Sequence, residues 1–226
     1  MKINKIGRGI INSISIGRNV NINGFSFSKD GAFSSSDKGE NVSERRSVES
    51  FEEIVSTAAA DVNVSFGEVF SVTVEGGAKA VASTIVEVKR GALSIATNAS
   101  FVNERVTVAI TMAGSLNKLK LKGAGDAEIE GMNQELFTAI LSGAGDLEVS
   151  GNVEVAVFCL TGTGDVDASS LDAESVEIES SGVGDVKARA TRRVIVDASG
   201  VGDVSVKGGA TDVTSKSRGV GDVKIR

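Results

Sequence analysis

"SGVGDVKA" (residues 181–188) is the stretch that decides the fold. The same Gly-x-Gly-Asp motif occurs six times in the second half of the chain, and its last copy stands in the terminal "RGVGDVKIR". A repeat of about 20 residues is typical of solenoids, in which each unit buries its apolar face only by stacking on its neighbours. Successive motif Asp residues are 18 to 20 positions apart, and they are Asp126, Asp146, Asp165, Asp185, Asp203 and Asp222.

Apolar and polar residues alternate after each motif Asp. In "GDAEIEG" (residues 125–131), Ala127 and Ile129 would face inward, and Glu128 and Glu130 would face solvent. Alternation with a period of two indicates a β-strand with one buried face. Three short strands and three turns fill a period of this length, which is one coil of a parallel β-helix, and about nine such coils fit into residues 48–226. The sequence therefore predicts an all-β fold.

The chain before the repeats has two further zones. Residues 1–28 alternate in short pieces broken by Gly and Asn, which indicates short strands with tight turns. Residues 29–47 are polar and Ser-rich and predict a loop or linker. The stretch "SVESFEEIVSTAAA" (residues 47–60) favours strand–turn–strand over helix. We expect a β-rich N-terminal segment and polar linker over residues 1–46 and a repeat β-helix domain over residues 47–226.

Composition narrows the classes of partner and the cellular location. The net charge of −6 argues against nucleic acid and against anionic membrane surfaces as partners. No stretch approaches the roughly 18 apolar residues of a membrane span, so no membrane insertion is expected. The first residues lack an apolar signal-peptide core of about 7–15 residues, which favours a cytoplasmic protein. The single Cys, Cys159 in "VFCL", is interpreted as a small buried apolar residue.

The residue types needed for common catalytic sites are missing. The chain has no His, which removes Ser-His-Asp and Cys-His arrangements and the commonest general acid–base group near pH 7. One Cys and no His also exclude zinc sites of the Cys/His type. No local motif points to a Ser-Lys dyad or a carboxylate pair. We therefore expect no enzyme activity, no catalytic residue and no cofactor.

The repeated motif has a structural interpretation and a metal-binding alternative. The glycines can supply the positive φ that a tight bend requires, and the Asp carboxylate can cap amides of its own turn. Alternatively, stacked coils would align six carboxylates about 5 Å apart, and calcium prefers such oxygen ligands. The structural interpretation is favoured, and no other metal site is expected. The residues of the motif are Gly123, Gly125, Asp126, Gly143, Gly145, Asp146, Gly162, Gly164, Asp165, Gly182, Gly184, Asp185, Gly200, Gly202, Asp203, Gly219, Gly221 and Asp222.

The outward residues that follow each motif Asp change sign along the chain. They are acidic in the first three units and basic on balance in the last three. The basic residues could simply relieve repulsion within the Asp column, or the gradient could orient packing against another copy of the chain. The residues of this possible interaction face are Glu128, Glu148, Asp167, Lys187, Arg189 and Lys224.

The order of segments resembles a known bacterial family. A stretch of the form F-x-x-I-x-x-x-x-x-x-D-V-x-V runs from Phe51 to Val64, and "SVTVEGG", "VKRGALSI", "VTVAI" and the Gly-x-Gly-Asp units follow it. Over residues 47–226 the chain is similar to the head GIN domain family, also labelled putative auto-transporter adhesin. The resemblance implies a right-handed parallel β-helix and a cell-surface location as the alternative to the cytoplasm. It carries over no catalytic residues.

These observations predict a non-catalytic structural or binding module of bacterial or phage origin. A rigid β-helix scaffold would bind a protein partner or a second copy of itself, so a homo-oligomer is expected. The alternative that the resemblance implies is a surface adhesin or glycan-binding domain. A polysaccharide-acting β-helix enzyme is the third possibility, and it would need a carboxylate pair that no motif singles out.

Overall fold

The computed structural model describes residues 20–22, 25–27, 33–34, 41–98 and 105–226. The chain forms two compact units, Met1–Gly39 and Glu40–Arg226. In the first unit, β1 (Val20–Ile22) pairs antiparallel with β2 (Phe25–Phe27), and β2 pairs antiparallel with β3 (Phe33–Ser34). The predicted strands at Ile14 and Ile16 lie outside the described residues.

The second unit begins with antiparallel strands. Strand β4 (Asn41–Arg46) pairs antiparallel with β7 (Ser71–Gly77), and β7 pairs antiparallel with β10 (Val106–Met112). The prediction of a loop over residues 29–47 is therefore wrong where β3 and β4 lie. Strand β4 forms part of the second unit because its backbone hydrogen bonds run to β7.

Residues 53–97 contain one element that the strand pattern does not predict. The stretch that favoured strand–turn–strand forms β5 (Glu53–Ser56) and β6 (Ala60–Phe66), as predicted. The short helix α1 (Ala78–Ser83) follows β7 and buries Ala80 and Val81 against the core. An antiparallel pair then follows, formed by β8 (Thr84–Lys89) and β9 (Ala92–Thr97).

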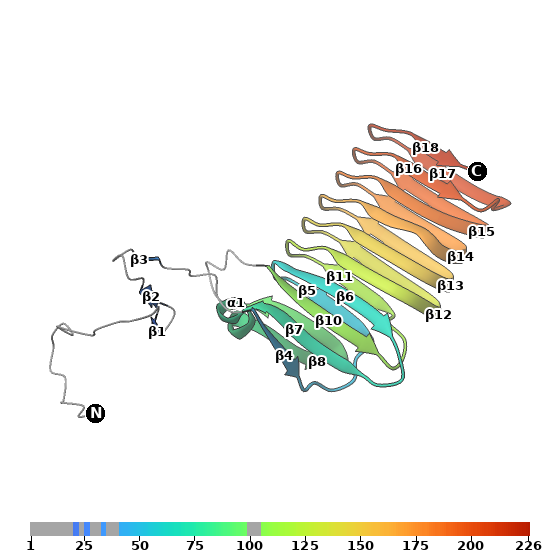
Figure 1. Cartoon of the computed structure of the whole chain (residues 1–226). Helices are drawn as coiled ribbons and strands as arrows, with labels where there is room; N and C mark the ends of the chain where they lie inside the picture. The colour runs from blue at the N-terminus through green and yellow to red at the C-terminus, as the bar shows by residue number, and fades with distance from the viewer. Residues whose placement is uncertain (1–19, 23–24, 28–32, 35–40, 99–104) are drawn as a thin grey trace, which may run out of the picture. The chain divides into compact units, whose positions relative to one another are not determined.

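From Lys118 onward the chain winds into stacked coils, and each strand pairs in parallel with the equivalent strand one coil away (Figure 1). The first partial coil uses β5 and β6, which pair in parallel with the strands of the next coil. The solenoid has about five turns. The prediction of nine coils is wrong because much of residues 41–112 forms antiparallel pairs. The coil strands are β11 (Lys118–Leu121), β12 (Ala127–Leu141), β13 (Leu147–Leu160), β14 (Val166–Ser180), β15 (Val186–Ala198), β16 (Val204–Lys207), β17 (Asp212–Ser217) and β18 (Val223–Ile225).

Each coil presents three outer faces, which we name by their place relative to the motif. In the coil that β12 forms, the motif face is residues 127–130, directly after Asp126. The middle face is residues 132–135, beyond the bend at Gly131, and the return face is residues 136–141. Neighbouring coils extend these three faces because the strands stay in register, apart from local shifts near the bends.

The core is a narrow apolar column inside the coils. Ala127 and Ile129 are buried, as the alternation predicted, and the equivalent residues of the next four motif units are buried as well. Phe137 and Phe158 meet edge to face in adjacent coils, with ring centroids 6.4 Å apart. Beyond Phe158 the core is filled by small and branched residues such as Val186 and Ala188.

Cys159 lies on the outside of this column. The residues on either side of it in β13, Phe158 and Leu160, are buried, so strand alternation turns the Cys159 side chain outward, where it is half-buried. The interpretation of Cys159 as a buried core residue is therefore wrong.

The glycines of the motif allow the backbones of successive coils to approach closely. A Cβ atom built on Gly184 would lie 2.0 Å from the carbonyl oxygen of Gly164 in the preceding coil. Gly184 also has φ +148°, a conformation that side chains with a Cβ rarely adopt. The first glycine of the motif, such as Gly182, meets the same close approach at 2.2 Å without a positive φ. Steric contact between coils, in addition to the bend, therefore requires glycine here.

We predict that Gly184→Ala lowers the free energy of unfolding by at least about 2 kcal/mol, because a strained φ and a forced clash each cost about 1–3 kcal/mol. Gly114→Ala is the matched control, since nothing lies within 4 Å of a Cβ built there and its φ is not positive. Urea denaturation of both variants measures the difference. Equal midpoints for the two variants would contradict the steric argument.

Candidate functional site

The motif Asp residues form a continuous hydrogen-bonded column along one corner of the solenoid. The Oδ1 atom of Asp165 accepts a hydrogen bond from the backbone N–H of Asp185 in the next coil, with an N–O distance of 2.8 Å. The same bond recurs at every step, at 2.8 to 3.1 Å. Each carboxylate therefore ties its own coil to the following one. The structure brings all six predicted motif units together at this corner.

The acceptor geometry differs from a turn cap. We expected each carboxylate to bond amides of its own turn, and the bond instead crosses to the neighbouring coil. Backbone hydrogen bonds also cross between coils at the corner, for example from the N–H of Val183 to the carbonyl of Gly162 at 2.9 Å. The ladder of inter-coil bonds is therefore unbroken around the bend.

Asp61 begins the column among the described residues, and the motif search misses it. Its Oδ1 accepts from the N–H of Asp126 at 3.1 Å, although 65 positions separate the two residues. The stretch "AAADVNV" (residues 58–64) keeps the spacing of small residues and the alternation of "GAGDAEI", with Ala in place of both glycines. A search that allowed Ala for Gly would have found it.

We predict that Asp165→Ala lowers the free energy of unfolding by about 1–2 kcal/mol, since it removes the partner of the Asp185 amide. Asp165→Asn keeps an acceptor oxygen of the same shape and should recover most of that loss. Urea denaturation measures stability, and hydrogen exchange of the Asp185 amide reports the bond itself. An equal loss in both variants would show that the charge matters and the acceptor does not.

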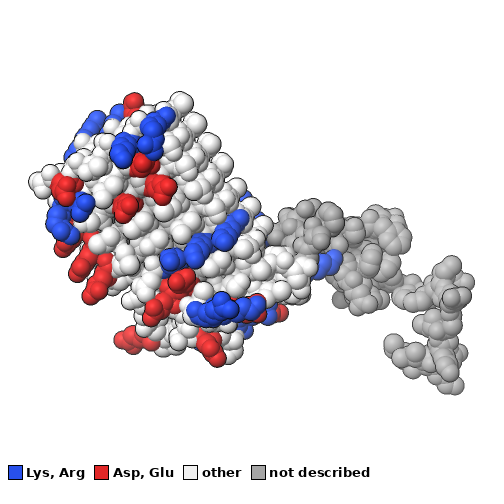
Figure 2. Space-filling view, turned by 180° about the vertical axis from the view of Figure 1, so that it is seen from behind, with Lys and Arg blue, Asp and Glu red and all other residues white. Residues whose placement is uncertain are grey.

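An open, acidic groove lies on the motif face beside the column. Among the described residues, carboxylates line it from seven positions, and one Lys, Lys187, borders it. Arg105 reaches Asp61 and Asp126 with N–O distances of 3.5 and 3.4 Å. On the side of the molecule shown in Figure 2, charged side chains gather in clusters and leave wide uncharged stretches between them. The carboxylates of the groove are Asp61, Asp126, Glu128, Asp146, Glu148, Asp165 and Asp167.

The structure places the predicted interaction residues in two neighbouring rows. Glu128, Glu148, Asp167 and Lys187 follow one another in register, and Lys224 continues the row beyond Ser205.

The basic members of this face pair with carboxylates of the same chain. Lys187 lies 3.7 Å from Asp167, and Lys224 lies 3.1 Å from Asp222. Arg189, in the second row, pairs with Asp172 at 2.6 Å. The acidic residues Glu128 and Glu148 therefore form the more available part of the face.

One carboxylate of the groove has a shifted pKa. Hydrogen bonds from Ser169 hold the pKa of Asp167 below its usual value, and Lys187 adds to this effect. Because folding lowers this pKa, the interaction stabilises the fold above the ordinary Asp pKa of about 3.9. The contribution is lost as the pH falls through the folded-state pKa.

We predict that Ser169→Ala raises the pKa of Asp167, measured by NMR titration of the carboxyl carbon. The Asp167 carboxylate accepts hydrogen bonds from the backbone amide and the hydroxyl of Ser169. Ser170→Ala, the same change at the next residue of β14, is therefore the matched control. The shift should exceed that of Lys187→Gln, since Ser169 is the larger cause. A larger shift in Lys187→Gln would reverse this ranking.

In the part of the chain that the structure describes, no group of three or more His, Cys, Asp or Glu side chains is arranged to hold a metal ion. None of the helices formed by those residues has the length and apolar character needed to cross a membrane.

The fold and the column define a parallel β-solenoid whose coils are joined by a ladder of Asp side chains. Residues 50–210 match the family described as "Putative auto-transporter adhesin, head GIN domain". The match spans most of the chain, and the chain belongs to this family. The resemblance inferred from the sequence is confirmed. A search among curated proteins finds no match.

Solved structures share the fold. The chain is similar to a putative adhesin from Bacteroides fragilis NCTC 9343, with 24% sequence identity and a TM-score of 0.66, covering 83% of this chain and 97% of that chain. It is also similar to a putative adhesin from Parabacteroides merdae ATCC 43184, with 14% identity and a TM-score of 0.50, covering 84% of this chain and 97% of that one. The predicted all-β, parallel β-helix fold is confirmed.

Proposed function

We propose that this protein is a non-catalytic binding module that holds a protein partner against the acidic motif face. The observation that carries the proposal is the groove, in which carboxylates from successive coils stand at a fixed spacing on a rigid stack. Strand spacing of about 4.8 Å sets the distance between neighbouring carboxylates. A partner segment with several Lys or Arg side chains complements such a row.

The aromatic residues favour a protein partner over a glycan. Sugar-binding surfaces usually present exposed aromatic rings, and this chain has neither Trp nor Tyr. Among the Phe residues of the second unit that the structure describes, Phe51, Phe137 and Phe158 are buried in the core, and Phe66 and Phe70 are half-buried and pack against it. A partner is therefore recognised through charge and hydrogen bonding along the coils.

The location that we propose is the cell surface or the extracellular space. Membership of a family described as putative adhesins, and the naming of a similar solved protein as a putative adhesin, support it. This location replaces the cytoplasmic one that the first residues favoured. Antibody labelling of intact cells tests it, and labelling that requires lysis would count against it.

The binding proposal is tested with full-length protein coupled to beads. The probes are a panel of purified extracellular-matrix and cell-surface proteins and a panel of glycans. We expect saturable binding to at least one protein with a basic surface. The double variant Glu128→Lys/Glu148→Lys should weaken that binding at least about tenfold, because it reverses adjacent charges of the groove.

Glu135→Lys/Glu154→Lys is the matched control. It makes the same change in net charge on the same two strands, but on the middle face. This control should retain the binding of the original chain. If both double variants weakened binding equally, net charge and not the groove would account for the effect, and the proposed site would be wrong. Binding to glycans and to no protein would overturn the proposal.

A further inference from the structure

The return face carries an apolar strip in the middle of the solenoid. The outward side chains on this part of β12 and β13 are uncharged, and strand register sets them side by side: Leu136 beside Val155, Thr138 beside Val157, and Ile140 beside Cys159. Leu136 is 46% exposed, and the other five side chains are half-buried. By contrast, the motif and middle faces of the same strands carry Glu128, Glu148, Glu135 and Glu154.

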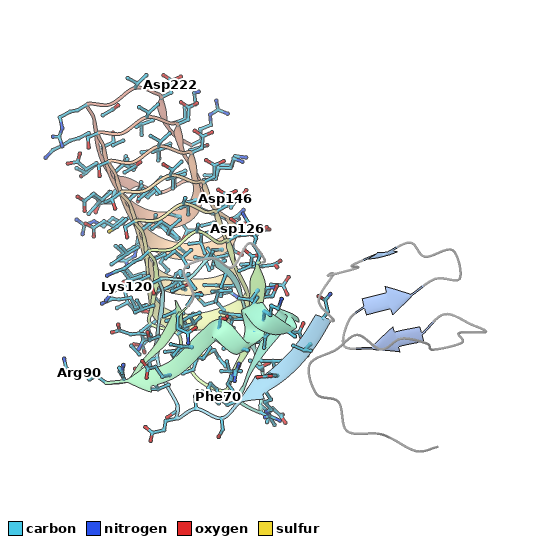
Figure 3. The ribbon with its side chains drawn as sticks, turned by 90° about the vertical axis from the view of Figure 1, so that its left-hand side faces the viewer. Phe70, Arg90, Lys120, Asp126, Asp146 and Asp222 are labelled. Carbon is cyan, nitrogen blue, oxygen red and sulfur yellow. The ribbon has the colours of Figure 1, made fainter. Side chains whose placement is uncertain are left out.

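Charges of opposite sign flank the strip on its two sides. On β11, Lys118 and Lys120 lie in register with Thr138 and Ile140. On β14, Glu177 and Glu179 lie in register with Val157 and Cys159. Across the stack, the outward side chains of the return face are therefore basic on β11, apolar or uncharged on β12 and β13, and acidic on β14. Figure 3 shows Lys120 on the side of the stack away from Asp126 and Asp146.

The acidic side of the strip is uncompensated within the described chain. Lys120 has a neighbour of opposite charge in Glu53, 3.8 Å away, whereas neither Glu177 nor Glu179 forms an ion pair with a described residue. Their charges act on the strip itself: burial raises the pKa of the Cys159 thiol, and Glu179 and Glu177 raise it further.

We propose that the return face binds a second copy of this chain, with the two solenoids face to face and their coils running in opposite directions. A two-fold axis along the strands, midway between β12 and β13, sets each β12 over the partner's β13. The same rotation sets β11 over the partner's β14. Lys118 and Lys120 then oppose the partner's Glu177 and the partner's Glu179, twice in each dimer. Such an isologous contact is self-complementary in both shape and charge.

Charge complementarity also selects the orientation. If the coils of the two copies ran in the same direction, β11 would lie over β11 and β14 over β14. The lysines of β11 would then face the lysines of the partner's β11, and Glu177 and Glu179 would face the glutamates of the partner's β14. Like charges placed opposite one another disfavour an interface. The antiparallel arrangement places the apolar strip against itself and sets the lysines of β11 opposite the glutamates of the partner's β14.

The size of the face predicts a reversible dimer. Six neighbouring strands, from β5 to β15, span it. At about 4.8 Å per strand and about 17–20 Å of strand length, each copy buries roughly 500 Å². This area lies at the small end of specific interfaces, so we expect dissociation in the micromolar range.

Sedimentation velocity of the full chain across a concentration series tests the proposal. We expect a monomer–dimer equilibrium that Lys120→Glu weakens at least about tenfold, and Glu179→Lys likewise, because each places like charges at two contacts. An equimolar mixture of the two variants should restore the dimer, since every contact is then a pair of opposite charges. The double variant Lys120→Glu/Glu179→Lys should dimerise as the original chain does. Lys120 and Glu179 lie on strands separated by β12 and β13, so the rescue cannot arise within one chain.

Lys187→Glu is the matched control on the motif face and should leave the dimer unchanged. A monomer at all concentrations would overturn the proposal, and so would a dimer that Lys187→Glu disrupts and Lys120→Glu does not. Higher oligomers unaffected by either charge reversal would assign self-association to another surface. Thermal melting of each variant separates unfolding from loss of the interface.

Cys159 supplies an independent test, since it is the one Cys of the chain. In the antiparallel dimer Cys159 and the partner's Cys159 lie on opposite sides of the axis, about one strand spacing (roughly 4.8 Å) apart across the stack, so a short bis-maleimide should link two copies of the original chain. A dimer in solution that the reagent does not link through Cys159 would overturn the antiparallel arrangement. The dimer face and the proposed partner surface are on different faces of the solenoid. Partner binding by a chain that stays monomeric would refute the dimer alone, and dimers that bind no partner would refute the partner surface alone.

Discussion

The contact between successive backbones at the Gly-x-Gly-Asp corner is the constraint on which the rest of the structure depends. With no Cβ at either glycine, the carbonyl of one coil lies where a side chain of the next would have to be. The hydrogen-bond ladder can therefore continue around the bend, and the Asp carboxylate adds one inter-coil bond at each step. Because both glycines and the Asp recur in each motif coil, register is fixed again once per coil.

Fixed register turns each sequence position into a column that runs along the solenoid. Inward columns of Val, Ala, Leu and Ile make the core, and outward columns set the character of each face. The Asp column shows how like charges can be stacked: each Oδ1 accepts a backbone N–H, and Arg105 and Lys224 approach the column near its two ends. The return face uses the same geometry differently, with an apolar strip bordered by Lys on one side and Glu on the other. A single coil architecture thus supports two surfaces of different chemistry.

The repeats could be read from the sequence because motif spacing and alternation both report the coil directly. Residues 41–112 were harder, since alternation is the same in parallel and antiparallel strands and cannot tell β7 and β10 from a coil. The corner at Asp61 was hidden because Ala stands where the motif has Gly. Cys159 was misplaced although the parity of Phe158 and Leu160 assigns it to the outer face. The acidic groove follows from the sequence once the register is known. The composition of the return face could not be predicted in this way, because it depends on β11 and β14 lying on either side of β12 and β13 in the sheet.

At the Gly-x-Gly-Asp corner, the two glycines cannot be replaced without a steric clash, whereas the residue between them tolerates different side chains. The residue between the two glycines points into solvent, and it varies from Ala to Thr to Val along the stack, with Val183 and Val201 each half exposed. Its backbone bridges to the equivalent residue of the next coil whatever the side chain is. Substitutions can therefore change this row of side chains one coil at a time without disturbing the stacking of the coils. The solenoid thus has a row of exposed positions at which a new binding surface can evolve with little loss of stability.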